Sequence, residues 1–145
     1  MKSSFVLAAL VASAFAQGID IGAPVEYSNI TPGSNITVEV DRPDTLTGST
    51  PVALVIAIES CTSYPDGQCA SVDVTQRLQH ILYTGSYDPV FDTPSDSKPP
   101  HQNFSVQIPS NLPQGQAAIT ASHFSLIGAG PFPNLQVVNV TVNVV

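Results

Sequence analysis

Apolar and polar residues alternate along three stretches of the chain, residues 35–41, 103–108 and 138–144. In each stretch the apolar positions hold Ile, Val or Phe, and the positions between them hold Asn, Thr, Ser, Gln or an acidic residue. This period of two is the pattern of a β-strand with one buried face and one face in water. A shift of one residue would turn the whole apolar set toward water, so the pattern also predicts which face of each strand is buried.

Further strands are predicted from less regular stretches. Residues 51–59 are apolar almost throughout, which predicts a central strand covered on both faces. Residues 116–124 predict another strand, and residues 19–21 begin a first one. In residues 73–83 the spacing of the apolar residues predicts a helix, whereas residues 81–84 predict a strand that ends at Gly85. We favour the strand here.

Turn residues separate these strands and set the predicted fold class. The chain has 13 prolines and nine glycines, which lie mostly between the apolar stretches. The longest such loop, residues 85–101, contains four of the prolines. About seven short strands without a convincing helix predict an all-β fold, a β-sandwich of the immunoglobulin or fibronectin type III kind. A small β-barrel is the alternative.

The first sixteen residues have the three parts of an export signal. Lys2 gives a positive start, an apolar stretch extends from Phe5 to Phe15, and small residues precede a cleavage point after Ala16. The apolar stretch is much shorter than the roughly 20 residues that a membrane-spanning helix needs. We therefore expect residues 1–16 to be a signal peptide and residues 17–145 to form one secreted domain, which begins at Gln17 after cleavage.

Two cysteines, Cys61 and Cys69, are the only ones in the chain. An even pair in an exported protein usually forms a disulfide, and the alternative is two free thiols. Residues 64–67, Tyr-Pro-Asp-Gly, predict a turn that brings the cysteines together. The spacing excludes a CxxC redox motif. We expect a disulfide that shapes one loop.

Four asparagines stand in the N-x-[S/T] motif for N-glycosylation, which is typical of a eukaryotic secreted protein. Three of them occupy the polar register of an alternating strand, where a glycan would point into water, and the fourth lies in a loop before Pro32. The alternative is that they are unmodified polar positions. The four residues are Asn29, Asn35, Asn103 and Asn139.

The charge of the chain limits its partners. It has four Lys and Arg against eleven Asp and Glu, a net charge of −7. Nucleic acid and anionic membranes bind to positive surfaces, so neither is an expected partner. Beyond the signal peptide no segment is apolar and long enough to insert into a membrane.

A search for catalytic and metal-binding motifs gives no site. His80, His101 and His123 have no partner at a metal-ligand spacing. We expect His101 to be solvated in the proline-rich loop and His123 to be a structural residue. Asp88, Asp92 and Asp96 could bind calcium through carboxylate oxygens, but their spacing is not that of an EF-hand and prolines interrupt it, so a solvated acidic loop is the favoured interpretation.

Nucleophile and phosphate motifs are also missing. There is no G-x-S-x-G elbow, and the Gly-Ala-Gly-Pro of residues 128–131 predicts a tight turn that opens no helix. We therefore predict that the protein is not an enzyme, that it binds no metal or cofactor, and that it acts as a monomer.

Several short motifs together resemble a known family, the fungal family of necrosis-inducing secreted protein 1. The resemblance covers nearly the whole chain after the signal peptide and is most specific over residues 123–131. It implies a secreted effector that binds host proteins, in particular receptor-associated kinases, and suppresses plant pattern-triggered immunity or induces cell death. Such a protein would act in the host apoplast or inside the host cell, and the family brings no catalytic residues. The motifs are Arg42-Pro43, Ser60-Cys61, residues 81–85, residues 103–109 and residues 123–131.

A second function of a different class is a structural or carbohydrate-associated glycoprotein of the fungal cell wall. It is based on the glycosylation motifs, the surface rich in Ser, Thr and Asn, and the sandwich fold. Stacking on sugars would need tyrosines aligned on one face. The four tyrosines are Tyr27, Tyr64, Tyr83 and Tyr87.

Overall fold

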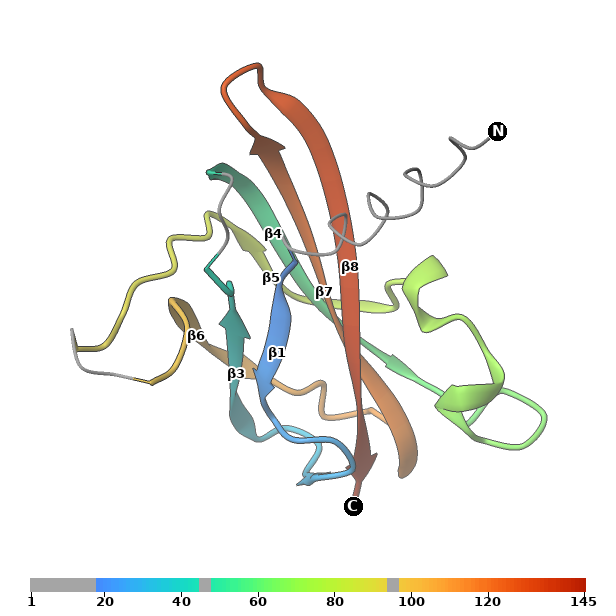
Figure 1. The fold of residues 1–145 in the computed structure, drawn as a ribbon. Coiled ribbons are helices and arrows are strands. Elements are labelled where there is room, and N and C mark those ends of the chain that lie inside the picture. Colours follow the sequence, from blue (N-terminus) through green and yellow to red (C-terminus); the bar gives the residue numbers. More distant parts are fainter. Residues whose placement is uncertain (1–17, 45–47, 94–96) are drawn as a thin grey trace, which may run out of the picture.

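The chain folds into two packed sheets, described in a computed structural model for residues 18–44, 48–93 and 97–145 (Figure 1). The expected signal peptide and its cleavage point lie outside the described residues. The smaller sheet has the order β1-β3-β6, and the larger has the order β2-β8-β7-β4-β5. The bounds of the smaller sheet's strands are β1 Asp20–Ala23, β3 Asn35–Asp41 and β6 His101–Gln107. Those of the larger sheet are β2 Asn29–Ile30, β4 Ser49–Ser60, β5 His80–Gly85, β7 Gly115–Ile127 and β8 Phe132–Val144.

The predicted alternation determines which side chains enter the core. β3 and β6 pair antiparallel with Val38 opposite Phe104, and both side chains are buried. On the facing sheet β7 pairs with β8, placing Ile119 opposite Val140. The core between the sheets is a single cluster, and its residues include Val38, Val40, Leu54, Ile56, Ile58, Tyr87, Phe104, Ile119 and Val142.

The hairpin of β7 and β8 is longer than the sequence predicts. Its two 13-residue strands pair from Gly115 opposite Val144 to Ile127 opposite Phe132. The expected turn at residues 128–131 joins them, and Gly128 there has a φ of 76°, which favours glycine. The start of β8 is not evident from the sequence, because residues 132–137 have mixed polarity and include Pro133. The hairpin projects past the smaller sheet at the top of Figure 1.

The expectation that residues 51–59 are covered on both faces is wrong for the first half of β4. Residues 56–60 are buried, but Ala53 and Val55 are half-buried and Val52 is exposed. A bulge between Pro51 and Ala53 shifts the register with β7 there. Only the second half is covered on its outer face, because the chain after β4 folds back over it.

The uncertain stretch 73–83 contains a strand, as favoured. β5 begins at His80 and pairs antiparallel with β4. Two short 3-10 helices precede it, η1 (Cys69–Ser71) and η2 (Val74–Gln76). The side chain of Asp73 caps η2 by accepting a hydrogen bond from the backbone N–H of Thr75.

The all-β prediction is confirmed, with eight strands among the described residues. The immunoglobulin or fibronectin type III kind is not established, because the larger sheet curls like half a barrel. β2 pairs in parallel with the end of β8, and the other strand pairs are antiparallel. No helix among the described residues is long and apolar enough to cross a membrane.

Candidate functional site

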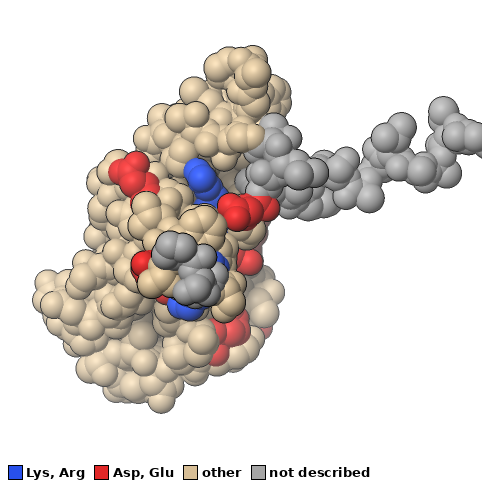
Figure 2. Space-filling view, turned by 60° about the vertical axis from the view of Figure 1, so that its left-hand side comes forward, with Lys and Arg blue, Asp and Glu red and all other residues tan. Residues whose placement is uncertain are grey.

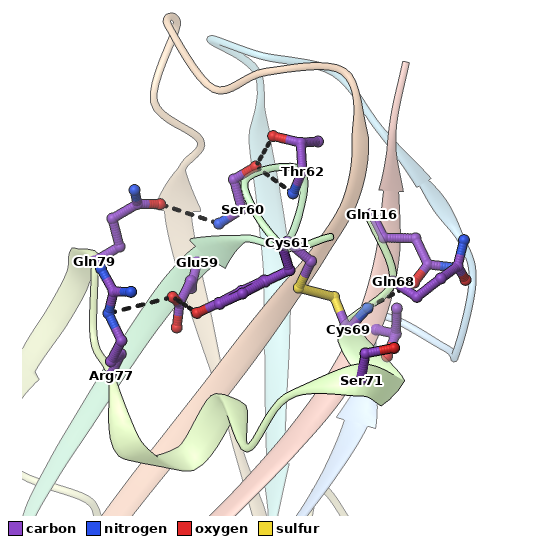
Figure 3. Close-up of a disulfide and its surroundings, with 12 residues drawn as sticks. Glu59, Ser60, Cys61, Thr62, Gln68, Cys69, Ser71, Arg77, Gln79 and Gln116 are labelled. Atoms are coloured by element: carbon purple, nitrogen blue, oxygen red, sulfur yellow. Dashed lines mark hydrogen bonds and ion pairs between the residues drawn. A yellow bond between two sulfur atoms is a disulfide. The ribbon is translucent and has the colours of Figure 1, made fainter. Parts of the chain in front are cut away.

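The segment 61–79 lies on the outer face of the larger sheet, held by a disulfide between Cys61 and Cys69 (Figure 3). Their Cα atoms are 5.2 Å apart. The predicted turn forms, since the N–H of Gly67 donates to the carbonyl of Tyr64 at 3.0 Å. Both cysteines and Val74 pack on Ala118 of β7, which faces away from the main core. The disulfide therefore fixes a cover over the second half of β4 and the start of β7.

A buried glutamate lies beneath this cover. The hydroxyl of Tyr64 donates to Glu59 Oε1 at 2.6 Å, which raises the pKa of Tyr64 above its ordinary value. Arg77 Nε lies 3.6 Å from the same oxygen, but its side chain is 65% exposed. Glu59 Oε2 is buried with no hydrogen-bond partner among the described residues. At the end of β4, Gln79 accepts a hydrogen bond from the N–H of Ser60 at 3.0 Å.

The loop after β5 is rooted in the core by Tyr87. Its hydroxyl donates to the carbonyl of Val40 at 3.0 Å, and its ring meets that of His123 edge-on with centroids 5.1 Å apart. Burial raises the pKa of Tyr87. Beyond it, the N–H of Asp88 donates to the side chain of Gln102 at 2.8 Å. The loop thus starts inside the sandwich and runs out along the edge of β6.

A second buried glutamate, Glu39, lies on the outer face of the smaller sheet. Lys98 Nζ donates to both of its carboxylate oxygens, at 2.8 and 3.0 Å. Gly22 of β1 makes room for it, because a Cβ there would come within 2.5 Å of Glu39 Oε1. Asp41 is next on the same face, and burial together with the charge of Glu39 raises its pKa.

The expectation that His101 is solvated is wrong. His101 begins β6 and is 3% exposed, and its ring lies between the smaller sheet and the loop. Nδ1 lies 2.9 Å from the carbonyl oxygen of Pro99, and Nε2 lies 3.2 Å from Asp92 Oδ2. The sequence places His101 in a proline-rich loop, and nothing local in it shows that the loop folds back over the ring.

His123 is a buried residue of the sandwich, as expected. It lies on β7 against Tyr87, and burial together with the charge of Arg42 lowers its pKa. His80 begins β5 opposite Ile58 of β4. The three histidines therefore lie in three separate settings.

The acidic residues considered for calcium lie on the surface of the same loop. Asp88 and Asp92 are exposed, and Asp96 lies outside the described residues. Asp92 reaches His101 rather than a second carboxylate of this set. Across residues 18–44, 48–93 and 97–145, no group of three His, Cys, Asp or Glu side chains is arranged to hold a metal ion.

All four asparagines of the glycosylation motifs are exposed. Asn35 and Asn103 lie on the outer face of the smaller sheet, where the alternation predicts them. Asn139 lies on the outer face of β8. Asn29 belongs to the two-residue strand β2 rather than to the expected loop. A glycan has access to each position, and its presence stays a prediction.

The four tyrosines do not form a sugar-stacking face. Tyr87 is in the core, and Tyr83 packs on Phe104 with ring centroids 4.5 Å apart. Tyr64 donates a hydrogen bond to Glu59 on the outer face of the larger sheet, and Tyr27 is exposed beside β2. The feature that would favour binding to sugars is therefore missing from the described residues.

An apolar patch lies on the outer face of the larger sheet, beyond the segment 61–79. We define it by four outward-facing side chains on four neighbouring strands, of which Val55 and Phe124 are half-buried and Ile81 and Leu135 are exposed. Strand register places them on one face, with Leu135 opposite Phe124 and Ile81 opposite Ala57. Ile81 is 62% exposed and Leu135 is 67% exposed.

The projecting end of the hairpin is uncharged, since residues 122–137 contain no charged residue. Figure 2 shows the same end as an uncharged top, with the acidic and basic side chains gathered across the middle of the molecule. The apolar patch is not evident from the sequence, because its residues come from four strands whose order cannot be deduced from the chain.

The comparisons with known proteins agree with the resemblance seen in the sequence. A scan against family models matches residues 12–143 to the Nis1 family. A search of curated proteins finds no match. The matched region covers nearly the whole chain and includes every described strand except the last residue of β8. The chain belongs to the Nis1 family, the necrosis-inducing secreted protein 1 family.

Proposed function

We propose that this chain is a secreted effector that acts as a monomer by binding a host protein, without catalysing a reaction. Membership of the Nis1 family suggests a fungal necrosis-inducing secreted effector with an extracellular location. Its mode of action is to occupy a surface of a host protein. By family resemblance the partner is a receptor-associated kinase, and the outcome is suppressed pattern-triggered immunity or cell death.

The observation that carries the proposal is the apolar patch. Contiguous apolar surface on a soluble domain usually marks an interaction site. Here Ile81 stands on β5, which pairs with β4, and Leu135 stands on β8, which pairs with β7. A partner would therefore meet a rigid surface that loses little conformational entropy on binding. The uncharged hairpin end beside the patch also favours protein over nucleic acid or anionic lipid.

The test is retention of host proteins by the purified protein. The mature chain is immobilised and incubated with plant extract, and retained proteins are identified. We expect a receptor-associated kinase to be retained, and the double variant Ile81→Ser/Leu135→Ser to lower its affinity by roughly tenfold or more. Val25→Ser is the matched control, because Val25 is 69% exposed and lies outside the patch, between β1 and β2. No retained kinase or surface receptor at micromolar concentration would contradict the proposal.

A cell-wall role is the second candidate, and it rests on the four exposed glycosylation motifs. It predicts that the protein sediments with insoluble glucan or chitin. The scattered tyrosines weigh against it. Protein that stays wholly in the supernatant with both polymers would exclude this candidate.

A further inference from the structure

One buried histidine joins the loop after β5 to the smaller sheet. The loop residues 88–93 run beside β6, and Val90 and His101 exchange two backbone hydrogen bonds of 3.0 Å. The same stretch presents Val90 and Phe91 to solvent. Two side-chain contacts tie this stretch to β6: Gln102 accepts a hydrogen bond from the N–H of Asp88 at 2.8 Å, and Asp92 Oδ2 lies 3.2 Å from His101 Nε2.

The surroundings of the ring favour a proton on both nitrogens, although Nε2 is buried and makes no hydrogen bond among the described residues. Nδ1 faces the carbonyl oxygen of Pro99, an acceptor, so it carries a hydrogen. In a neutral ring Nε2 would then be an unprotonated acceptor, and it would face Asp92 at 3.2 Å and Glu39 Oε2 at 3.9 Å. Two acceptors at that distance repel each other. A protonated ring instead donates on one side to the carbonyl of Pro99 and on the other forms an ion pair with the carboxylate of Asp92.

The other charged groups around the ring come from three elements. β3 contributes Glu39 and Asp41, and the loop contributes Asp92 and Lys98. β1 contributes Asp20, which pairs with Asp41 in the register. Lys98 donates two hydrogen bonds to Glu39. Among these groups His101 is the one whose ordinary titration falls near neutral pH.

We propose that His101 is a pH-sensitive latch, which holds residues 88–93 against β6 in acidic medium and releases them as the medium becomes neutral to alkaline. The hydrogen bond to Pro99 and the charges of Asp92 and Glu39 raise the pKa of His101. A raised pKa in the folded state means that the latch stabilises fully below the ordinary value of about 6.5. Its contribution disappears as the pH rises through the higher, folded value.

The latch is a property of the chain alone and does not depend on the host partner proposed above. Release would free the stretch that carries Val90 and Phe91, and the core anchor Tyr87 would keep its start in place. A secreted protein that passes between acidic and neutral surroundings would thereby change one edge of its surface without unfolding.

The test is hydrogen exchange of the full mature protein, read by mass spectrometry and corrected for intrinsic rates. The peptide covering residues 86–93 is compared at about pH 5.5 and about pH 8, on either side of the ordinary imidazole pKa. We expect the protection of this peptide to fall severalfold at the higher pH. Equal protection at both values would overturn the proposal.

Three variants assign the effect. His101→Gln should remove the pH dependence, and His80→Gln, a histidine on another sheet, should leave it as it is in the parent protein. If His101→Gln does not fold, Asp92→Asn replaces it, because Asp92 is an exposed loop residue. Asp92→Asn should lower the protection at acidic pH and weaken the dependence. A dependence that survives either substitution unchanged would overturn the proposal.

Discussion

One segment lies against each of the two sheets, beside a buried glutamate. The interactions that hold the two segments in place differ. The segment 61–79 covers Glu59 on the larger sheet, closed by a disulfide and by the neutral hydroxyl of Tyr64. The loop after β5 meets the smaller sheet through Lys98, which donates to Glu39, and through Asp92, which lies 3.2 Å from His101 at the start of β6. The segment 61–79 is therefore sensitive to reduction and the loop after β5 is sensitive to pH, so the two segments can be released separately.

The largest effect is expected from removing the disulfide. The double variant Cys61→Ser/Cys69→Ser should lower the free energy of unfolding by roughly 2–3 kcal/mol, because the unfolded chain regains the freedom of a short loop. Urea unfolding measures this loss. A reductant should destabilise the parent protein similarly and leave the double variant unchanged. A variant as stable as the parent would show that the hydrogen bonds of Tyr64 and Gln79 hold the segment by themselves.

The next effect is on the ion pair of the smaller sheet. Lys98→Met should cost about 1–2 kcal/mol, since a hydrogen bond to a charged group contributes about 1.5–3 kcal/mol and Lys98 is 53% exposed. Arg77→Met is the matched control on the larger sheet and should cost less than about 0.5 kcal/mol. Equal losses in the two variants would contradict the distinction between the two glutamates.

Much of the fold follows from the sequence because it depends on local pattern. Alternation placed Val38, Phe104 and Val142 in the core and turned Asn35 and Asn103 outward. The disulfide follows from two cysteines on either side of a turn motif. These features need only the strand period and the chemistry of neighbouring residues.

The site could not be predicted in the same way because it depends on where distant segments come to rest. His101 is buried by a loop that returns over it, and the first half of β4 stays open because the segment 61–79 covers only the second half. The apolar patch needs the strand order β8-β7-β4-β5. No window of the sequence contains that order.

A smaller effect is the pH dependence of stability that comes from His101. The stability of the parent protein should decline from about pH 6.5 upward, because a raised pKa in the folded state makes His101 bind its proton more tightly there than in the unfolded chain. His101→Gln should show no such decline. Thermal unfolding at closely spaced pH values measures it, and a parent protein that becomes more stable over the same range would reverse the sign and contradict the latch.

The smallest effect is expected at low pH, in the segment 61–79. Hydrogen bonds from Ser71 and Gln68 lower the pKa of Asp66, and those from Thr75 lower the pKa of Asp73. Their contribution is present above the ordinary value of about 3.9 and is lost as the pH falls through the lower, folded values. Hydrogen exchange of the peptide 66–76 should therefore quicken, after correction, only in strong acid. Quickening near neutral pH instead would contradict this assignment.

The two segments are held in place independently, one by a disulfide and one by a protonated histidine. The most direct measurement follows hydrogen exchange of peptides 61–79 and 86–93 together, at about pH 5.5 and about pH 8, with and without a phosphine reductant. We predict that the reductant loosens only 61–79 and that the higher pH loosens only 86–93. If both peptides lost protection together under either condition, the two segments would form one cooperative unit and would not be held independently.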